Sequence, residues 1–345
     1  MSRLTRSVGV VMAGALALIG QSDLASAQSI LEKVRQRGYV SCGASQGVPG
    51  LSRPDEKGVW RGFDSDVCRA VAVAVFGDKD KARFVPLNAA QRLPAIQTGE
   101  IDVLSRTTTM TFTRDMAVRF VALTIYDNDA LLVHKKLNIK TAKDLNGLTV
   151  CLQGGGSLTE QALDEMEEEN PGVKMKRVYF DSTIQARDSY FAGRCDSYVT
   201  DGLAAWGQRA SAAKNPEDHQ VFYVGHSTEP NGVAIPRGDD KWFDITRYAI
   251  NVLIWAEDEG ITSANVDEVL KTTKKSEVKR VLGGEPGWGK IIGLDDKWAY
   301  NIIKQLGNYG EIWDRNLGKN SRLQAERKLN KLYKNGGLMF PIPFI

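Results

Sequence analysis

The sequence predicts an α/β protein made of two units and a helical C-terminal part. Strand-like and helix-like segments alternate from Tyr39 to about residue 105, and the alternation begins again near residue 130. After residue 237 the apolar residues recur at helical spacing. Alternating strands and helices are typical of sheets covered by helices. The chain is long enough for two domains.

In the first unit, three short strands are separated by two helices, and this order predicts a parallel sheet. Asp64 can cap the first helix, which ends at Gly77, and Asn88 can cap the second, which ends at Gly99. The expected strands are YVSCGA (39–44), RFVPL (83–87) and IDVLS (101–105), and the expected helices are DVCRAVAVAVF (66–76) and AAQRLPAIQT (89–98).

The second unit repeats the pattern, and one further strand, NGVAIPR (231–237), precedes the helical tail. Its expected strands are 130–134, 148–152, 173–180, 195–200 and 219–225, and its expected helices are 157–169, 182–193 and 203–210. The tail is expected to be helical over 242–260, 263–272, 297–315 and 322–337.

The N-terminus is typical of an export signal. Arg3 and Arg6 precede the apolar run 8–20, and Ala25-Ser26-Ala27 forms a small-residue cleavage site, so the mature chain is expected to begin at Gln28. A membrane anchor is the alternative, but the run is shorter than the ~20 residues that cross a bilayer. The sequence therefore predicts a soluble exported protein with signal peptide 1–27.

Charge and cysteine content narrow the class of protein further. The formal net charge of +3 gives no electrostatic argument for nucleic-acid binding. Four cysteines in an exported chain favour disulfides over free thiols, although three pairings exist. Two cysteines lie in each unit, and pairing within the units gives Cys42–Cys68 and Cys151–Cys195.

No motif for catalysis, metal binding or a cofactor is present. His134, His219 and His226 lack the spacing of a zinc site, and no Walker loop, GxSxG or HExxH occurs. We therefore expect structural histidines, no metal and no cofactor.

Three polar features predict a binding site for a zwitterion. The run 154–157, GGGS, follows a strand and opens a helix, so its backbone N–H groups can face an anion. Thr107 and Thr109 can face one way beside Arg114, whose guanidinium suits a carboxylate. Asp201 follows a strand, where α/β sheets bind ligands, and suits an ammonium group.

Each feature also has a structural explanation. The glycine run could be a tight turn, the threonines could form a hydroxyl-rich loop beside a surface arginine, and Asp201 could cap a helix. Taken together, however, a cation with hydroxyl groups and a separate carboxylate match the two ends of an amino acid.

At these residues the chain resembles the periplasmic polar amino-acid-binding proteins of ABC transporters, in particular the general L-amino-acid-binding subgroup. The resemblance covers nearly all of the mature chain. The segments that carry it are WRGFDSDVCRAVAVAVFG, RFVPLNAAQRLPAIQTGEIDVLSRTTTMTFTRD, AKDLNGLTVCLQGG, YFAGRCDSYVTDG, PEDHQVFYV, GDDKWFDITRYAINVLIWAE and NYGEIWDRNLG.

The resemblance implies a type II periplasmic-binding-protein fold, in which two lobes are joined by two hinge strands and hold the ligand between them. It implies lobe 1 from 28–125 and 228–345, including the helical extension, and lobe 2 from 126–227. The hinge is expected near 124–127 and 224–227.

The same resemblance implies roles for individual residues. Thr107, Thr109 and Arg114 match the groups that bind the ligand carboxylate. Asp201 matches the aspartate that binds the α-amino group, and the segment from Gly155 to Ser157 matches a loop that meets the carboxylate from the second lobe.

The chain also departs from the family pattern. Gly156 and Leu158 stand where threonines are usual, and Val48 and Leu51 occupy the region of an aromatic residue that stacks on the ligand in many relatives. The segment STEPNGVAIP differs as well. These departures bear on the hydrogen bonds to the carboxylate and on the choice of ligand.

The expected function is that of a monomeric periplasmic solute-binding protein, which captures an amino acid and delivers it to the membrane permease subunits of an ABC importer without catalysis. A rival is a periplasmic enzyme on the same fold, such as a cyclohexadienyl dehydratase, which would need a general acid in the cleft. A third alternative is the sensing input of a chemoreceptor or kinase pathway.

Overall fold

The computed structural model describes residues 28–225 and 228–345. The predicted signal peptide, His226 and Ser227 lie outside these residues. In the part that is described, no helix is both long enough and apolar enough to span a bilayer.

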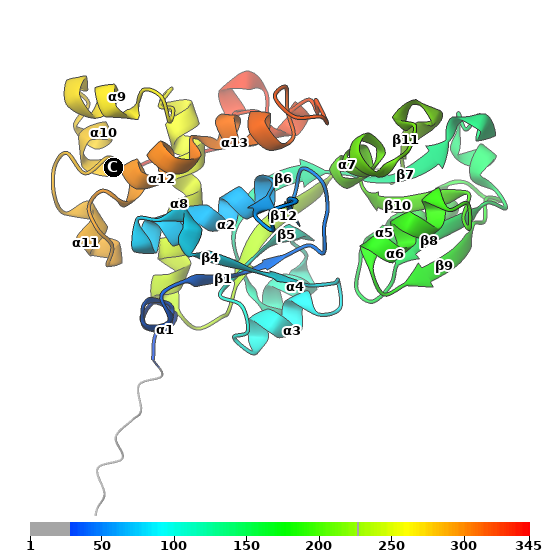
Figure 1. The fold of residues 1–345 in the computed structure, drawn as a ribbon, viewed down its shortest axis with the longest axis horizontal. Coiled ribbons are helices and arrows are strands. Elements are labelled where there is room, and N and C mark those ends of the chain that lie inside the picture. The colour runs from blue at the N-terminus through cyan, green and yellow to red at the C-terminus, as the bar shows by residue number, and fades with distance from the viewer. Residues whose placement is uncertain (1–27, 226–227) are drawn as a thin grey trace, which may run out of the picture.

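Two five-stranded sheets form the centres of two lobes (Figure 1). The first sheet has the order β4-β1-β5-β12-β6 and the second β11-β7-β10-β8-β9. A small ribbon, β2 (Arg53–Pro54) with β3 (Trp60–Arg61), lies beside the first. The strands are β1 (Val40–Ala44), β4 (Ala82–Pro86), β5 (Val103–Thr109), β6 (Arg119–Asp127), β7 (Asp129–His134), β8 (Thr149–Gln153), β9 (Lys176–Phe180), β10 (Ser197–Asp201), β11 (His219–Tyr223) and β12 (Glu229–Ile235).

The three strands predicted for the first unit do run parallel, but each complete sheet is mixed, because further strands join it in the opposite direction. β1 pairs in parallel with β4 and β5, and β8 does so with β9 and β10. By contrast, β12 is antiparallel to β5 and β6, and β7 is antiparallel to β10 and β11. The chain leaves the first sheet along β6 and returns along its neighbour β12, which forces these strands to run in opposite directions.

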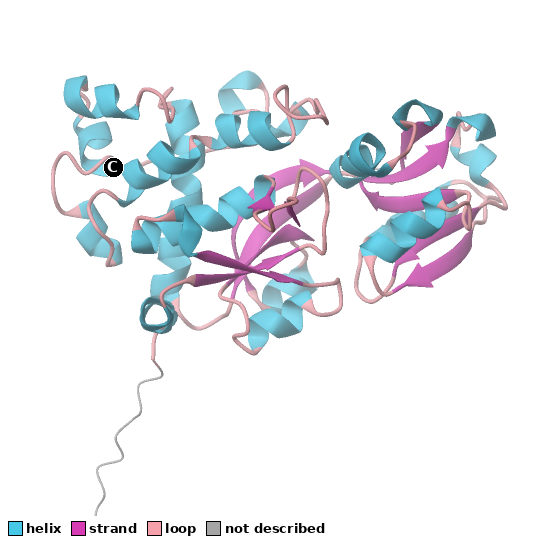
Figure 2. Ribbon diagram, in the orientation of Figure 1, coloured by secondary structure: helices cyan, strands magenta, loops and turns pink. Residues whose placement is uncertain are grey.

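Helices cover both sheets, and most of them belong to the first lobe (Figure 2). This α/β architecture with two lobes and extra C-terminal helices confirms the predicted fold class. The predicted residue boundaries between the lobes stay a prediction. The helices are α1 (Ile30–Arg37), α2 (Phe63–Phe76), α3 (Arg92–Gln97), α4 (Phe112–Ala117), α5 (Thr159–Glu169), α6 (Thr183–Phe191), α7 (Gly202–Ala212), α8 (Asp240–Asp258), α9 (Val266–Thr272), α10 (Ser276–Val281), α11 (Trp288–Ile292), α12 (Trp298–Leu306) and α13 (Tyr309–Asn316).

The first lobe has separate apolar clusters on the two faces of its sheet. One cluster joins β1 to α2, α8 and α12 through residues such as Val71, Trp242 and Ile302. The other packs Ile96 of α3 against Ile101, Leu104 and further residues. Burial of these side chains at about 25 cal/mol per Å² is the main force that holds the sheet between its helices.

Two predicted helix caps are wrong in detail. α2 begins at Phe63 after Gly62, so Asp64 lies within its first turn and is buried rather than capping it. α3 begins only at Arg92. Asn88 does accept a hydrogen bond from the Gln91 backbone N–H at 2.9 Å, but this contact closes a turn ahead of the helix.

The predicted helix over 322–337 is also wrong, because this segment contains only two short 3₁₀ turns, Lys328–Asn330 and Tyr333–Asn335. Tertiary contacts override its helical propensity. The Asn330 side chain accepts from the Tyr126 N–H at 2.7 Å and donates to the Tyr126 carbonyl at 2.9 Å, which fastens the tail to β6.

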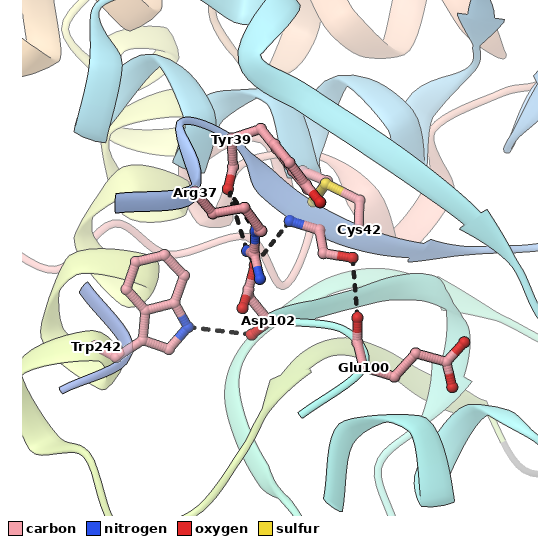
Figure 3. Close-up of a disulfide and its surroundings, with 8 residues drawn as sticks. Arg37, Tyr39, Cys42, Glu100, Asp102 and Trp242 are labelled. Atoms are coloured by element: carbon pink, nitrogen blue, oxygen red, sulfur yellow. Dashed lines mark hydrogen bonds and ion pairs between the residues drawn. A yellow bond between two sulfur atoms is a disulfide. The ribbon is translucent and has the colours of Figure 1, made fainter. Parts of the chain in front are cut away.

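Both predicted disulfides are present. Cys42–Cys68 joins β1 to α2, and Cys151–Cys195 joins β8 to the turn before β10. Beside Cys42, the Asp102 carboxylate accepts from the Ser41 N–H at 2.7 Å and pairs with Arg37, and Trp242 Nε1 donates to the Asp102 carbonyl at 3.1 Å (Figure 3). These contacts tie the beginnings of the neighbouring strands β1 and β5 to α8.

Candidate functional site

A pocket lies between the lobes and is lined by residues from both sheets. Its polar residues follow or end strands: Ser45 after β1, Gln153 at the end of β8 and Asp201 at the end of β10. Ligands of α/β proteins bind at this edge of the sheet, outside the carboxyl ends of the strands. Of the predicted site residues, the pocket is lined by Thr107, Thr109, Ser157 and Asp201.

Thr107 and Thr109 lie at the end of β5 in different local environments. Thr107 has a backbone φ of 30°, which is unusual for a β-branched residue, and its N–H donates to Asp64 Oδ2 at 3.2 Å. The Thr109 hydroxyl donates to Glu229 Oε2 at 2.6 Å. This hydroxyl is therefore already engaged by a carboxylate of the protein.

Arg114 is held at the border between the lobes. It lies in α4, whose first turn is capped by Thr111, because the Arg114 N–H donates to the Thr111 hydroxyl at 3.3 Å. Its guanidinium donates to the Thr109 carbonyl at 3.0 Å and to the Gly156 carbonyl at 2.7 Å. Arg114 is buried, so it is not the surface arginine of the structural alternative.

Two arginines line the pocket, and neither was predicted from the sequence, whereas the predicted Arg114 is not among the lining residues. Arg92 of α3 donates to the Thr108 hydroxyl at 3.2 Å and to the Gly156 carbonyl at 3.3 Å, while its buried Nε has no hydrogen-bond partner among the described residues. Arg106 of β5 donates from Nε to the Leu87 carbonyl at 2.9 Å. Burial lowers the pKa of Arg92, Arg106 and Arg114.

The loop between β8 and α5 forms the opposite wall. Gly155 and Gly156 have φ values of 78° and 94°, which favour glycine. A Cβ atom at Gly155 would lie 3.2 Å from Ala90 Cβ of the first lobe, so the two lobes approach closely here. The Ser157 hydroxyl lies 2.8 Å from the Thr159 hydroxyl.

Two of the departures from the family pattern, Leu158 and Val48, lie in the lining of the pocket. Thr159 lines the pocket beside Leu158, so a hydroxyl group is available one position after the expected one. Val48 also lines the pocket, in place of an aromatic residue.

Asp201 ends β10 and precedes α7, but its side chain makes no capping hydrogen bond. Asp201 therefore occupies the N-cap position of α7 while its carboxylate is not used by the helix. Burial, and then the charge of Glu229, raises the pKa of Asp201, while Arg106 and Arg92 act in the opposite direction.

Asp201 belongs to a cluster of three carboxylates, with Asp129 of β7 and Glu229 of β12, in which one oxygen from each lies within 4.8 Å of the other two. Asp129 is 3% exposed. Burial and the charges of Glu229 and Asp201 raise the pKa of Asp129 to about 9. Such a cluster has the chemistry to hold a metal ion or an ammonium group.

Two further carboxyls, those of buried Asp64 and half-buried Asp127, interact electrostatically with Asp201. Burial raises the pKa of Asp64 to about 7, against the hydrogen bond from Thr107. Burial and Asp201 raise the pKa of Asp127 to about 7, although Asp127 accepts from the Leu203 N–H at 2.8 Å. The pocket thus has arginines on the first lobe and a group of acids where the lobes join.

The described histidines lie away from this pocket. His219 Nδ1 lies 2.6 Å from the Tyr190 hydroxyl, and its ring is 5.2 Å from that of His134. Both occupy paired positions on β11 and β7.

Comparison with known proteins finds binding proteins that match nearly the whole chain. Residues 40–282 match the model of the bacterial extracellular solute-binding proteins, family 3. A general L-amino acid-binding periplasmic protein of Rhizobium johnstonii is 42% identical over 96% of this chain and 96% of its own length. A glutamate/glutamine/aspartate/asparagine-binding protein of Rhodobacter capsulatus is 39% identical over 96% and 98%.

The solved structure of an ABC transporter periplasmic binding protein from Brucella ovis with glutathione bound is also similar. It has a TM-score of 0.88 and 40% identity, and the match covers 92% of this chain and all of that one (100%). Family, relatives and architecture agree with the resemblance found in the sequence. The chain belongs to the bacterial extracellular solute-binding proteins of family 3.

Proposed function

We propose that this protein captures an amino acid, or a similar zwitterion, between its two lobes and delivers it to an ABC importer. One observation supports this most strongly. Arg114 and Arg92 converge on the Gly156 carbonyl on one side of the pocket, and the cluster of Asp129, Asp201 and Glu229 lies on the other. Charges of opposite sign within one pocket match the two ends of an amino acid.

The α-carboxylate of the ligand is assigned to the arginine side. Arg114 offers planar paired donors, and the hydroxyls of Thr107, Ser157 and Thr159 line the same pocket. We also assign backbone N–H groups of the loop at Gly155 as donors to the ligand carboxylate. Thr109 has a secondary role, because its hydroxyl donates to Glu229 at 2.6 Å.

The α-ammonium group is assigned to Asp201. Its carboxylate makes no capping bond, and the neighbouring Glu229 adds negative charge. Burial makes this pairing strong, because a hydrogen bond between charged groups gains from exclusion of water.

The names of the relatives support a broad or polar choice of side chain. Those relatives are named for general L-amino acids, for glutamate, glutamine, aspartate and asparagine, and for bound glutathione. In this chain, Arg92 lines the pocket and its Nε has no partner among the described residues, so it can meet an acceptor on a ligand side chain. The Gln153 amide also lines the pocket, but it already donates to the Asp181 carbonyl and accepts from the Thr183 hydroxyl.

Closure of the lobes is proposed to be a hinge motion. The chain passes between the sheets twice, from β6 to β7 and from β11 to β12. We assign the hinge to 124–127 and 224–227, with lobe 1 as 28–125 and 228–345 and lobe 2 as 126–227. Close approach of Pro49 to Gly207 of α7, where an added Cβ would lie 2.5 Å from the Pro49 oxygen, supports a closed arrangement.

Export by a cleaved signal peptide, a monomeric state and docking to permease subunits complete the proposal. The two disulfides and the periplasmic relatives support an oxidising compartment. No cofactor or metal is included.

Catalysis is the rival function. It would need a general acid, and Asp64 and Asp127 have raised pKa values, but neither lines the pocket between the lobes. The relatives, moreover, are named as binding proteins. Incubation with arogenate and prephenate, with detection of aromatic products, separates the two functions, and we expect no turnover.

The direct test is native mass spectrometry of the purified protein, followed by calorimetric titration of ligand-free protein with the twenty L-amino acids and glutathione. We expect an amino acid or γ-glutamyl peptide to co-purify and to bind with a stoichiometry of about one. Absence of binding to every member of this set would refute the proposal.

A further inference from the structure

The carboxylate cluster is held together by the register of the strands. Asp129 and Asp201 are directly opposite each other on the antiparallel strands β7 and β10. Glu229 stands opposite Asp127 on β12 and β6 in the same way. Like charges directly opposite one another in a sheet are destabilising. The fold therefore forces these acids together rather than allowing them to separate.

Among the described residues, Asp129 has no cation or N–H donor as a partner, and its neighbour at hydrogen-bonding range is another carboxyl, that of Glu229. Neither of its carboxylate oxygens has a hydrogen-bond donor in the described part of the chain, although the residue is 3% exposed. The guanidinium groups of Arg92, Arg106 and Arg114 donate to other acceptors, chiefly backbone carbonyls. A buried carboxylate without a donor is strongly disfavoured in its charged form.

The charged groups around Asp129 come from every neighbouring element. Glu229 on β12, Asp201 on β10 and Asp127 on β6 are all acids that raise its pKa. On α5, Glu165 lines an adjoining cavity together with Asp129. The cations of this region are Arg92 on α3, Arg106 on β5 and Arg114 on α4. The charge of Asp201 acts on all three, and that of Glu229 acts on Arg92 and Arg114.

Asp129 and Asp201 belong to the second sheet, and Glu229 begins β12 of the first sheet next to the crossing between the lobes, so only the Asp129–Asp201 pair is fixed within one lobe. β7 begins two residues after β6 ends, and β12 begins at Glu229 itself. The crowding of Asp129 against Asp201 is a property of one sheet and is present in open and closed forms alike.

We propose that Asp129 holds a proton in the ligand-free protein, and that this proton passes to solvent when the ammonium group of an amino acid enters between Asp129, Asp201 and Glu229. This inference rests on the proposed function. The ammonium group keeps its own protons and donates N–H hydrogen bonds to the carboxylates. The Asp129 O–H bond breaks, the proton is taken up by buffer, and Asp129 becomes the second counter-ion beside Asp201.

The direction of the pH effect follows from this step. A proton is released on binding wherever the pH lies below the pKa of ligand-free Asp129, about 9, and above its pKa in the complex. Affinity should therefore increase as the pH rises from about 6 to 8, by up to roughly tenfold per pH unit for one proton. Below the pKa of the complex, Asp129 stays protonated in both states and the effect vanishes.

Isothermal titration calorimetry with L-glutamate, L-glutamine and L-aspartate tests the proposal. Titrations are run near pH 7.5 in PIPES, HEPES and Tris, whose ionisation enthalpies rise in that order. We expect binding that is more exothermic in Tris than in PIPES, corresponding to release of about one proton. Asp129→Asn should remove most of this difference, and Asp188→Asn, an exposed control on α6, should keep it.

The possible results separate the two proposals. Binding whose enthalpy is independent of the buffer overturns the proton release and leaves the proposed function standing. A buffer dependence that persists in Asp129→Asn overturns the assignment to Asp129. Failure of all three amino acids to bind wild-type protein overturns both proposals for them.

A second measurement covers the case in which Asp129→Asn binds too weakly to titrate. A raised pKa in the folded state means that stability falls as the pH rises above the unfolded pKa of about 4. Asp129→Asn removes this penalty, so ligand-free variant protein should gain melting temperature over wild type at pH 8 and not at pH 4. An equal difference at both pH values contradicts the proposal.

Discussion

The guanidinium of Arg114 donates a hydrogen bond of 2.7 Å to the Gly156 carbonyl, and this bond joins α4 of the first lobe to the glycine loop of the second. Arg92 donates to the same oxygen at 3.3 Å. The two arginines proposed to meet the ligand thus also contact the opposite lobe. The proposed function therefore predicts that ligand binding and lobe closure are coupled through these side chains.

Arg114→Ala should weaken amino-acid binding at least tenfold. Loss of one partner of a buried charged hydrogen bond costs roughly 2–5 kcal/mol, and Arg114 is buried. The measurement is calorimetric titration with the amino acid identified by mass spectrometry. Arg119→Ala is the control, since Arg119 is exposed and stacks on Phe243 away from the pocket. Equal affinity of wild type and Arg114→Ala would remove Arg114 from the site.

Asp201→Asn tests the ammonium assignment, because it keeps the shape of the side chain and removes its charge. Amino-acid affinity should fall by more than tenfold, while the weak binding of the corresponding des-amino acid should change little. Affinities for both compounds are measured on both proteins. A similar loss for the two compounds would show that Asp201 acts on the fold rather than on the ammonium group.

The two disulfides should differ in their effect on binding. Each closes a loop worth about 3–4 kcal/mol in the chain-entropy model. Replacement of Cys151 and Cys195 by Ser should lower both melting temperature and affinity, because the bridge joins β8, which leads to the glycine loop, to the segment that leads to Asp201.

Replacement of Cys42 and Cys68 by Ser should lower mainly the melting temperature. That bridge joins β1 to α2 within the first lobe and is not attached to the segments that lead to the glycine loop or to Asp201. Thermal unfolding and titration at a temperature where both variants are folded separate the effects. Equal loss of affinity in the two variants would contradict the distinction.

Gly207→Ala should hinder closure without unfolding the protein. In α7, alanine ordinarily stabilises a helix relative to glycine by about 0.5–1 kcal/mol. Here the added Cβ would lie 2.5 Å from the Pro49 carbonyl oxygen of the other lobe. Ligand affinity should fall several-fold while the ligand-free melting temperature is kept or raised. Ala212→Ser at the exposed end of α7 is the control, and unchanged affinity in Gly207→Ala would exclude this contact from the bound form.

Residues next to strand ends could be predicted from the sequence. Thr107, Ser157 and Asp201 follow recognisable strands, and parallel strands bring such positions to one edge of a sheet. Both disulfides were predicted because the cysteines divide between the two units. These inferences need only local pattern and topology.

The acids at the junction of the lobes could not be predicted in this way. Asp129 and Glu229 enter the site through the register of β7 with β10 and of β12 with β6, which long-range pairing decides. The sequence did carry a signal for β6, since RFVALTIYD is rich in β-branched and aromatic residues. Arg92 was within a predicted helix, but its inward direction depends on the turn that delays the start of α3.

The most direct test of zwitterion capture uses wild-type protein and three compounds: the amino acid that co-purifies, its des-amino acid and its α-carboxamide. Calorimetric titration of each measures what the ammonium and carboxylate groups contribute. The proposed site predicts that each analogue binds at least a hundredfold more weakly than the amino acid, since each leaves one set of buried charges unpaired. Affinity of either analogue within a few-fold of the parent would contradict the assignment of opposite charges to the two sides of this pocket.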